Sequence, residues 1–314
     1  MNFSTPIPLR QSKFLIDYNS KIISLGSCFA ENIGEKLNYF KFRNITNPFG
    51  IIFNPISIEK LVERAVVKNY FTEKDLFYHN ERWHCFEIHS DLSNASQTEF
   101  LEKLNQLLEE FILQIQTSNF FIITYGTSWI YRNLNNNKVV ANCHKMPQNQ
   151  FTKELLSVEN ILKSIQNTIF LIQSVNSNAQ FIFTISPVRH IKDGFFENNV
   201  SKAHLFSAIF KLLKNENVAY FPSYEILMDE LRDYRFYKKD MLHPSETAIA
   251  YIWDKFKNSF INPSVFPAIN DIEVIQKGLQ HKAFNPNSES HQQFLSQLQN
   301  KINLLQQHFP NIQF

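Results

Sequence analysis

The fold is decided by the stretch Ile22-Ile23-Ser24-Leu25-Gly26-Ser27-Cys28-Phe29-Ala30-Glu31. The apolar run at residues 22–25 is typical of a buried strand, and the spacing of residues 31–37 predicts a helix directly after it. Cys28 would then lie at a helix N-terminus, where free backbone N–H groups and the helix dipole stabilise a thiolate or an oxyanion. The stretch therefore predicts a strand, a turn with a nucleophile, and a helix.

The rest of the chain repeats this alternation of strand and helix. Three more apolar runs have the length and composition of buried parallel strands, at residues 120–124, 180–185 and 218–222. Helical patterns lie between them, at residues 58–68, 97–116, 158–174 and 200–214. We expect a doubly wound three-layer α/β/α sandwich with a central, mostly parallel sheet. In such sheets ligands bind beyond the carboxyl ends of the strands.

A second motif, Asp240-Met241-Leu242-His243-Pro244, precedes a predicted helix at residues 244–256. An Asp three residues before a His can hold the imidazole in the tautomer that accepts a proton. Asp before a helix is also a common capping residue, which is the structural alternative for Asp240. Together with the first motif, this pair indicates a hydrolase.

The run Gly-Ser-Cys-Phe-Ala at residues 26–30 is the signature of the GSCFA domain, and residues from about 20 to about 260 resemble that domain. The domain is similar to the SGNH (GDSL-type) hydrolase superfamily, whose closing block Asp-x-x-His-Pro is intact at residues 240–244. The resemblance implies an SGNH-hydrolase-like domain at residues 1–262. Residues 263–314 form a C-terminal extension, in which spacing predicts one more helix.

Two residues compete for the role of nucleophile. Laid in register on Gly26, the catalytic Ser of the superfamily falls on Cys28, whereas a slip of one residue makes Ser27 the nucleophile. We favour Cys28, because a helix N-terminus and a neighbouring His tend to lower the pKa of a thiol. The structural alternative is a buried cysteine that fills space under the helix.

The resemblance also implies an oxyanion hole. Gly50 matches a superfamily Gly that gives its backbone N–H, although it is equally an ordinary turn glycine. Ser128 takes the place of a superfamily Asn, and its hydroxyl can donate one hydrogen bond to an oxyanion. Asn142 is a substitute donor. Five other polar residues at the predicted strand ends are candidates for substrate binding: Asn47, Thr127, His144, Arg189 and His190.

Two of these candidates have specific alternatives. Arg189 would clamp a carboxylate or phosphate of the substrate through its guanidinium fork. His190 is a second candidate for the general base, after His243. A cysteine peptidase or amidase that pairs Cys28 with His144 or His190 therefore stays open, as does an acyltransferase.

Composition excludes several classes. The 314 residues can bury a large core, and a net charge of +2 without a basic run disfavours nucleic acid as a partner. No apolar stretch reaches the roughly 20 residues that span a bilayer, and the N-terminus lacks a signal-peptide pattern, which predicts a cytoplasmic protein. Three cysteines without C-x-x-C spacing predict neither disulfides nor a zinc site, and we expect no metal or other cofactor.

These observations predict an esterase that forms an acyl-enzyme. The resemblance implies a small acyl group on a carbohydrate-like or other polar small molecule as substrate. The rival from another class is a non-catalytic ligand-binding module that has lost hydrolysis. An Asp-oriented His argues against that rival, because a site that only binds needs no poised base.

Overall fold

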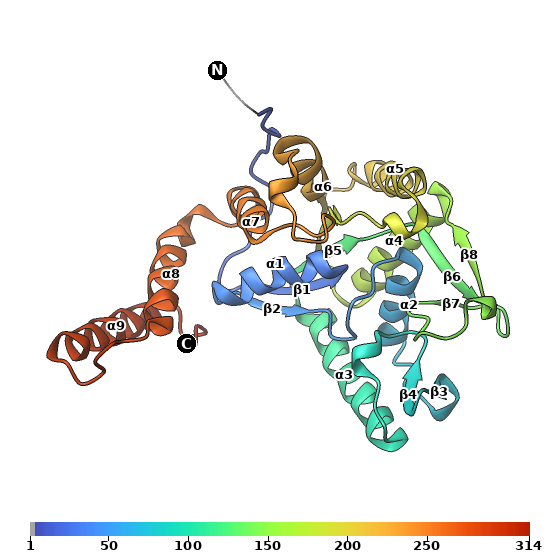
Figure 1. Ribbon diagram of the computed structural model, residues 1–314, viewed down its shortest axis with the longest axis horizontal. Coiled ribbons are helices and arrows are strands. Elements are labelled where there is room, and N and C mark those ends of the chain that lie inside the picture. Colours follow the sequence, from blue (N-terminus) through green and yellow to red (C-terminus); the bar gives the residue numbers. More distant parts are fainter. Residues whose placement is uncertain (1–3) are drawn as a thin grey trace.

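The computed structural model describes residues 4–314, and its centre is a five-stranded sheet in the order β10-β9-β5-β1-β2 (Figure 1). All neighbouring strands in it are parallel. The strands are β1 (Lys21–Gly26), β2 (Arg43–Thr46), β5 (Phe120–Tyr125), β9 (Gln180–Ile185) and β10 (Val218–Phe221). Four of the five confirm the predicted runs. The short, half-buried β2 was missed because it has no continuous apolar run.

Helices cover both faces of the sheet, which confirms the three-layer α/β/α arrangement (Figure 1). One face packs on α2 (Pro55–Val66), α3 (Gln97–Thr117), α4 (Val158–Val175) and α5 (Phe195–Leu212). The other packs on α1 (Cys28–Tyr39) and α7 (Glu246–Phe260), while the short α6 (Ser223–Glu225) follows β10. Side chains of a strand alternate between these two cores: Ile23 belongs to the first and Ile22 to the second.

The strand order fixes where a ligand can bind. From β1 the chain moves one way to β2, and all later strands are added on the other side of β1, starting with β5. The order therefore reverses between β1 and β5, where Gly26 pairs with Thr124 at the carboxyl ends of both strands. Open α/β sheets bind ligands at such a switch point, because the loops diverge there and leave a crevice. The turn at Cys28 lies directly beyond it.

Two small antiparallel units flank the main sheet. One is the hairpin of β3 (Leu76–His79) and β4 (Arg82–Cys85). The other joins β6 (Trp129–Asn133), β7 (Val139–Val140) and β8 (Phe151–Leu155), with an Asn-rich turn between β6 and β7. The β3–β4 hairpin was not predicted, because its strands are four residues each and carry charged or His side chains.

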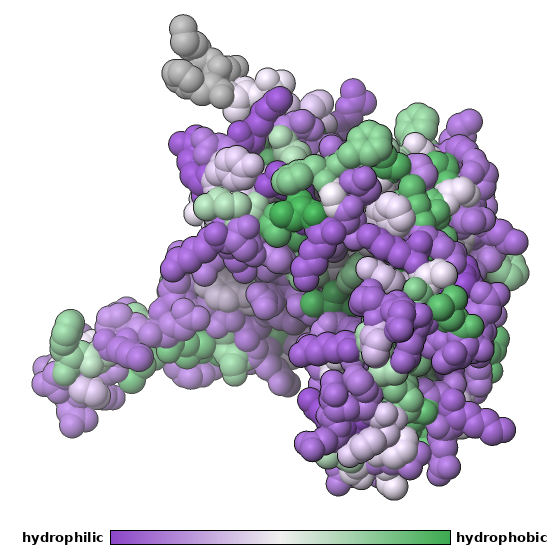
Figure 2. All heavy atoms as spheres, turned by 45° about the vertical axis from the view of Figure 1, so that its right-hand side comes forward, coloured by the Kyte–Doolittle hydropathy of each residue, from purple (hydrophilic) through white to green (hydrophobic). Residues whose placement is uncertain are grey.

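The C-terminal extension contains two helices, α8 (Phe266–Gln280) and α9 (Glu289–His308), so the prediction of one helix is wrong. The missed α8 has Pro267 in its first turn, where proline is tolerated because that N–H needs no helical partner. Figures 1 and 2 show the two helices as an arm that stands away from the sheet. Within residues 4–314, no helix combines the length and apolarity needed to cross a lipid bilayer.

The arm shares its core with the start of the chain. Ile16 forms a parallel bridge with Ile261, immediately after α7. Tyr18 lies with its ring 4.6 Å from that of Phe42 and 4.9 Å from that of Phe309. Side chains of α8 and α9 therefore close one apolar cluster together with the N-terminal segment and α1.

Candidate active site

The turn at Cys28 is built from close main-chain contacts. Gly26 adopts a φ of +132°, and a Cβ there would lie 2.1 Å from the carbonyl oxygen of Thr124, so only glycine fits. The N–H of Gly26 donates to Oδ1 of the buried Asn47 at 2.9 Å. The N–H of Ser27 donates to the Thr124 carbonyl at 3.0 Å. These contacts fix the direction in which α1 leaves the sheet, and hence the position of Cys28.

Ser27 and Cys28 have different environments. Ser27 is only 2% exposed, and its hydroxyl accepts a hydrogen bond from the N–H of Phe29 at 3.2 Å as the N-cap of α1. Cys28 is the first residue of the helix and is partly exposed. Its backbone N–H finds no acceptor in the part of the chain that the structure describes. The thiol and one free backbone donor therefore lie together at the helix start.

The pKa of the Cys28 thiol is raised, which corrects the expected lowering. Burial is the main cause, and the nearby Glu31 carboxylate adds to it. The backbone N–H groups of residues 28 and 29 and the ammonium of Lys202 lower the pKa, but burial outweighs them. The thiol is therefore protonated at neutral pH and needs a base to become a nucleophile.

Asp240 and His243 form the pair that the sequence predicts. Asp240 Oδ2 lies 2.6 Å from His243 Nδ1, while its Oδ1 accepts the backbone N–H groups of Leu242 and His243. These backbone donors, followed by the imidazole, hold the pKa of the Asp240 carboxyl far below its usual range. The helix-cap alternative is wrong, because Ser245 caps α7 by accepting from Ala248. Nδ1–H donation to Asp240 leaves Nε2 of His243 free to accept a proton.

Arg189 is tied to the loop that carries this pair. Its Nη2 donates to the carbonyl of Met241 at 2.8 Å, and the guanidinium lies over the rings of Tyr234 and Tyr237, at 5.7 and 5.2 Å from their centroids. Nη2 is thus used by the loop, while Nε is buried without a hydrogen-bond partner among residues 4–314. A cavity of about 390 Å³ opens beside it, and its walls include Arg189, Arg232, Asp233, Tyr224, Tyr234 and Tyr237.

His190 lies deeper than its neighbour. Its ring is 5.4 Å from that of Phe53, and its Nε2 is buried without a hydrogen-bond partner among residues 4–314. Burial, and after it the charges of Lys202 and His243, lower the pKa of His190 to about 3. A histidine so reluctant to be protonated is a poor general base, which argues for His243 in that role.

The predicted oxyanion donors Gly50 and Ser128 are engaged elsewhere. Gly50 donates its N–H to the carbonyl of Asn47 at 2.8 Å, so it is a turn glycine. Ser128 is fully buried and donates its hydroxyl to the carbonyl of Ser201 at 2.8 Å. Thr127 shares a 2.8 Å hydrogen bond with the Ser201 hydroxyl. Thr127 and Ser128 therefore attach α5 to the end of β5, and Asn47 holds Gly26.

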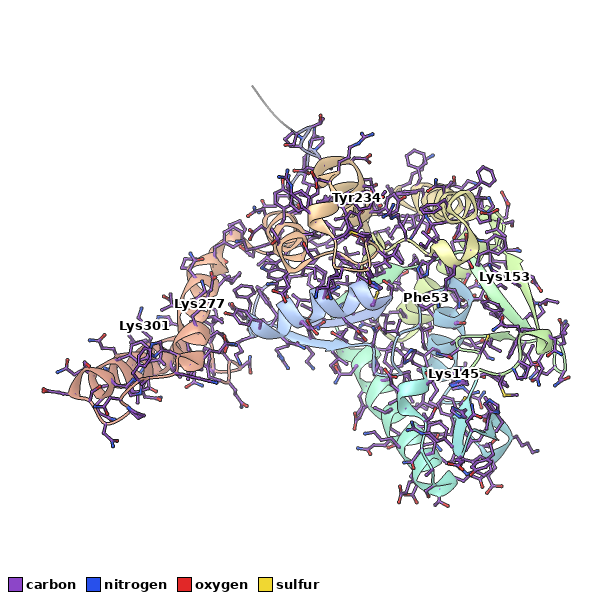
Figure 3. The ribbon with its side chains drawn as sticks, in the orientation of Figure 1. Phe53, Lys145, Lys153, Tyr234, Lys277 and Lys301 are labelled. Carbon is purple, nitrogen blue, oxygen red and sulfur yellow. The ribbon has the colours of Figure 1, made fainter. Side chains whose placement is uncertain are left out.

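The loop of Asn142 and His144 belongs to the β3–β4 side of the molecule. Asn142 Oδ1 accepts the N–H of His144, whose Nε2 lies 2.7 Å from the carbonyl oxygen of Cys85. His144 is 3% exposed, and burial lowers its pKa to about 4. Figure 3 shows the neighbouring Lys145 below Phe53, toward β4. His144 is therefore a packed structural histidine. Within residues 4–314, no group of three or more His, Cys, Asp or Glu could hold a metal ion.

Lys202 is the charged residue at this edge that sequence reasoning missed. It projects from α5, is 2% exposed, and donates from Nζ to the carbonyls of Gly126 at 2.6 Å and Ser186 at 2.7 Å. Burial lowers its pKa to about 7. The sequence signal was its position three residues before Leu205, on the apolar face of a predicted helix.

A known family model matches a part of the chain that includes both motifs. The model of the GSCFA family matches residues 21–256, from the start of β1 to α7, and so includes Cys28, Asp240 and His243. A second model, GSCFA domain protein, C-terminal domain, matches residues 272–314, which hold most of α8 and all of α9. No curated protein matches the chain.

Proposed function

Because the chain belongs to the GSCFA family, and because its signature cysteine lies at a helix N-terminus at the switch point of a parallel sheet, we propose that it hydrolyses carboxylic ester or thioester bonds. The observation that carries the proposal is Cys28, partly exposed and with a free backbone N–H. The paired Asp240 and His243 in the same family match support it. So does the resemblance of both motifs to SGNH hydrolases.

In the proposed mechanism His243 Nε2 takes the thiol proton as Cys28 Sγ attacks the acyl carbonyl. The N–H of Cys28 and the dipole of α1 stabilise the oxyanion. The alcohol or thiol leaves with the proton from His243, and an acyl-thioester forms on Cys28. Water, deprotonated by His243, then releases the acid. Asp240 holds the imidazole and stabilises its charge throughout.

The substrate we propose is a small acyl group on a polar, carbohydrate-like molecule. The cavity beside Arg189 has three tyrosine rings and several charged groups in its walls. Aromatic faces with a few polar groups suit sugar rings and other polar scaffolds. Its contact with the Asp240–His243 loop, through Arg189 and Met241, supports this cavity as the place of the leaving group.

A second candidate is a ligand-binding module without turnover. The observation in its favour is that Gly50 and Ser128 already donate their hydrogen bonds to carbonyl groups of the protein. Losing one oxyanion donor typically costs about 10² to 10³ in rate. A site whose only oxyanion donor is the Cys28 N–H would therefore hydrolyse esters slowly. The same lack of donors would slow acyl transfer to an acceptor other than water, and cleavage of an amide.

Hydrolysis of p-nitrophenyl acetate tests the proposal, using wild type, Cys28→Ala, Ser27→Ala and His243→Ala, with mass spectrometry of the acylated peptide. We expect an acetyl adduct on Cys28, and loss of turnover in the Cys28 and His243 variants. An adduct on Ser27 would replace the nucleophile. If a series of esters gives neither turnover nor an adduct, the ligand-binding module without turnover becomes the better explanation.

A further inference from the structure

A separate cavity of about 360 Å³, here called the α2–α4 cavity, lies between α2, α4 and the β6–β7–β8 unit. Figure 1 shows these elements side by side, and α2 contacts both α4 and β7. None of them carries Cys28, Asp240 or His243, so other elements build this cavity than build the candidate active site. Its volume falls within the roughly 300 to 1,000 Å³ that is typical of small-molecule sites.

One face of α4 turns polar side chains toward the α2–α4 cavity. Asn160, Lys163, Ser164 and Asn167 line it, at positions i, i+3, i+4 and i+7 of the helix. This spacing places the four side chains on one side of α4. Asn160 and Lys163 are exposed, whereas Ser164 is buried, so the row runs from the rim of the cavity into its interior.

The interior end of this row is a hydroxyl without a partner. Ser164 is 1% exposed, and its Oγ forms no hydrogen bond within residues 4–314. A serine or threonine inside a helix commonly bonds to the carbonyl one turn earlier, as Thr168 of the same helix bonds to the carbonyl of Ser164 at 2.9 Å. Buried polar groups are rarely left unpaired, because an unpaired group bears its full desolvation cost. The hydroxyl of Ser164 therefore points to a ligand in the cavity.

Two opposite charges line the same cavity without pairing with each other. Lys163 forms no ion pair and no side-chain hydrogen bond in the part of the chain that the structure describes. Glu59 of α2 accepts a hydrogen bond at Oε1 from Nδ2 of Asn167, at 2.8 Å, and its Oε2 accepts none from the described residues. Arg132, the third charged residue of the lining, already donates twice to Glu154. One cation and one carboxylate thus stay available to a ligand.

The rest of the lining is apolar. It consists of the half-buried Ile56 and Val139 and the buried Ile130 and Leu156. These side chains offer no hydrogen bonds, so the group that they suit is a hydrocarbon one. A ligand that matches the whole cavity therefore carries an anionic group, a cationic group and an apolar group.

We propose that the α2–α4 cavity binds an amino acid with an apolar side chain. The carboxylate of the ligand is bound by Lys163 and by the hydroxyl of Ser164, and its ammonium is bound by Glu59. Such charge-assisted hydrogen bonds are stronger than neutral ones. The side chain of the ligand lies on Ile130 and Leu156. This proposal is independent of the proposed hydrolysis, because it involves none of the groups that take part in it.

The first test is calorimetric titration of the full chain with L-leucine, 3-methylbutylamine and 4-methylpentanoate. The amine lacks the carboxylate of leucine, and the acid lacks its ammonium. Leucine should bind at least about tenfold more tightly than either, since each analogue loses one charge-assisted contact. Equal binding of all three, or no saturable binding of leucine, would overturn the proposal.

Variants of the two charged residues test where leucine binds. Glu59→Gln and Lys163→Met should each weaken leucine binding about tenfold, because each removes one charge that the ligand meets. Lys103→Met, at an exposed lysine of α3 outside the cavity, is the matched control and should bind leucine as wild type does. Wild-type affinity in either Glu59→Gln or Lys163→Met would overturn the proposal.

Ser164→Ala separates a ligand role from a structural one. The hydroxyl has no partner in the described residues to lose, so the melting temperature of the free protein should stay the same or rise. Leucine binding should become about threefold to tenfold weaker, because the carboxylate loses a donor. Thr168→Val removes a bonded hydroxyl of the same helix and should lower the melting temperature without changing the affinity for leucine. A lower melting temperature with unchanged leucine affinity in Ser164→Ala would show a purely structural role and overturn the proposal. Calorimetry needs no turnover, so this result is distinct from the outcome of the ester assay.

Discussion

The turn at Cys28 is held by contacts with neighbouring strands, whereas the loop at Asp240 and His243 is held mostly by hydrogen bonds within itself. Main-chain and buried side-chain groups of two other segments fix Gly26 and Ser27. In the loop, the side chains of Asp240 and His243 are 45% and 40% exposed, and a bond from Arg189 ties them to the β9 end. Cys28 is thus positioned by buried main-chain contacts, whereas His243 lies on an exposed loop. Damage at the turn should cost stability, and damage at the loop should cost activity.

The largest effect is expected for Asp240→Asn, which keeps the shape of the loop but offers His243 an amide. By analogy with other Asp–His pairs, ester hydrolysis should fall about 10³- to 10⁴-fold, because the imidazole loses its tautomer and its counter-charge. The melting temperature should barely change, because both side chains are exposed. Full activity in this variant would remove the pair from the mechanism.

The pH dependence of the same pair follows from the direction in which the pKa of Asp240 is shifted. The pKa of Asp240 is held far below its usual 3.8, so the carboxylate persists in acid well below that value. Its contribution to stability is present above pH 3.8 and is lost only as the pH falls through the lowered value. Protonation of Asp240 should therefore give no acid limb of activity above pH 4. A carboxyl NMR signal of Asp240 that titrates between pH 4 and 7 would contradict the lowered pKa.

Gly26→Ala should have the next largest effect, this time on stability. The new Cβ would meet the Thr124 carbonyl, and the backbone has a φ that other residues avoid. We expect a loss of about 3 kcal/mol or more in the free energy of unfolding, measured by urea denaturation. Gly278→Ala in α8 is the matched control, since its Cβ would meet side-chain ends of Leu298 and Phe294 and no backbone. Equal losses in both would contradict the rigid turn.

Arg189→Met should have a smaller effect on turnover. It removes the hydrogen bond to the Met241 carbonyl while keeping an apolar stem against the tyrosines. We expect about a tenfold lower kcat, because looser positioning of His243 costs rate, with little change in stability. Arg235→Met, at an exposed arginine that also lies over an aromatic ring, is the control and should leave kcat unchanged. A kcat for Arg189→Met equal to that of wild type would show that the loop of Asp240 and His243 keeps its conformation without Arg189.

Ser27→Ala should have the smallest effect. It removes the N-cap of α1, which typically costs about 1 kcal/mol of stability. Ser245→Ala, which removes the cap of α7, should cost a similar amount. Hydrolysis should stay within about tenfold of wild type, and loss of the acyl adduct in this variant alone would make Ser27 the nucleophile.

Most of the sheet could be predicted from the sequence because its signals are local. Strands β1, β5, β9 and β10 are continuous apolar runs, and the helices between them have clear periodicity. The edge strand β2 and the β3–β4 hairpin lack such runs, since one side of each faces solvent or polar groups. The pairing of β2 with β1 spans the whole of α1, so no short window of sequence contains it. The strands β3 and β4 pair with each other, but each is too short and too polar to give a periodic signal.

The candidate site divides in the same way. The helix-start position of Cys28 and the contact between Asp240 and His243 follow from spacings of a few residues, so both could be anticipated. Whether a donor is free cannot be anticipated, because Ser128 loses its hydroxyl to Ser201, 73 residues away. Lys202 was missed for the same reason, as its acceptors follow two other strands.

The bridge between Ile16 and Ile261, and the contact of Tyr18 with Phe309, have a consequence for synthesis on the ribosome. The N-terminal segment emerges first, but the apolar cluster it belongs to includes Leu298, Leu305 and Ile312 from the last part of the chain. That cluster cannot close until these residues have left the ribosome. A nascent chain that already has its whole sheet would still expose tyrosine and phenylalanine rings beside α1, and such surfaces are where incomplete chains aggregate or recruit chaperones.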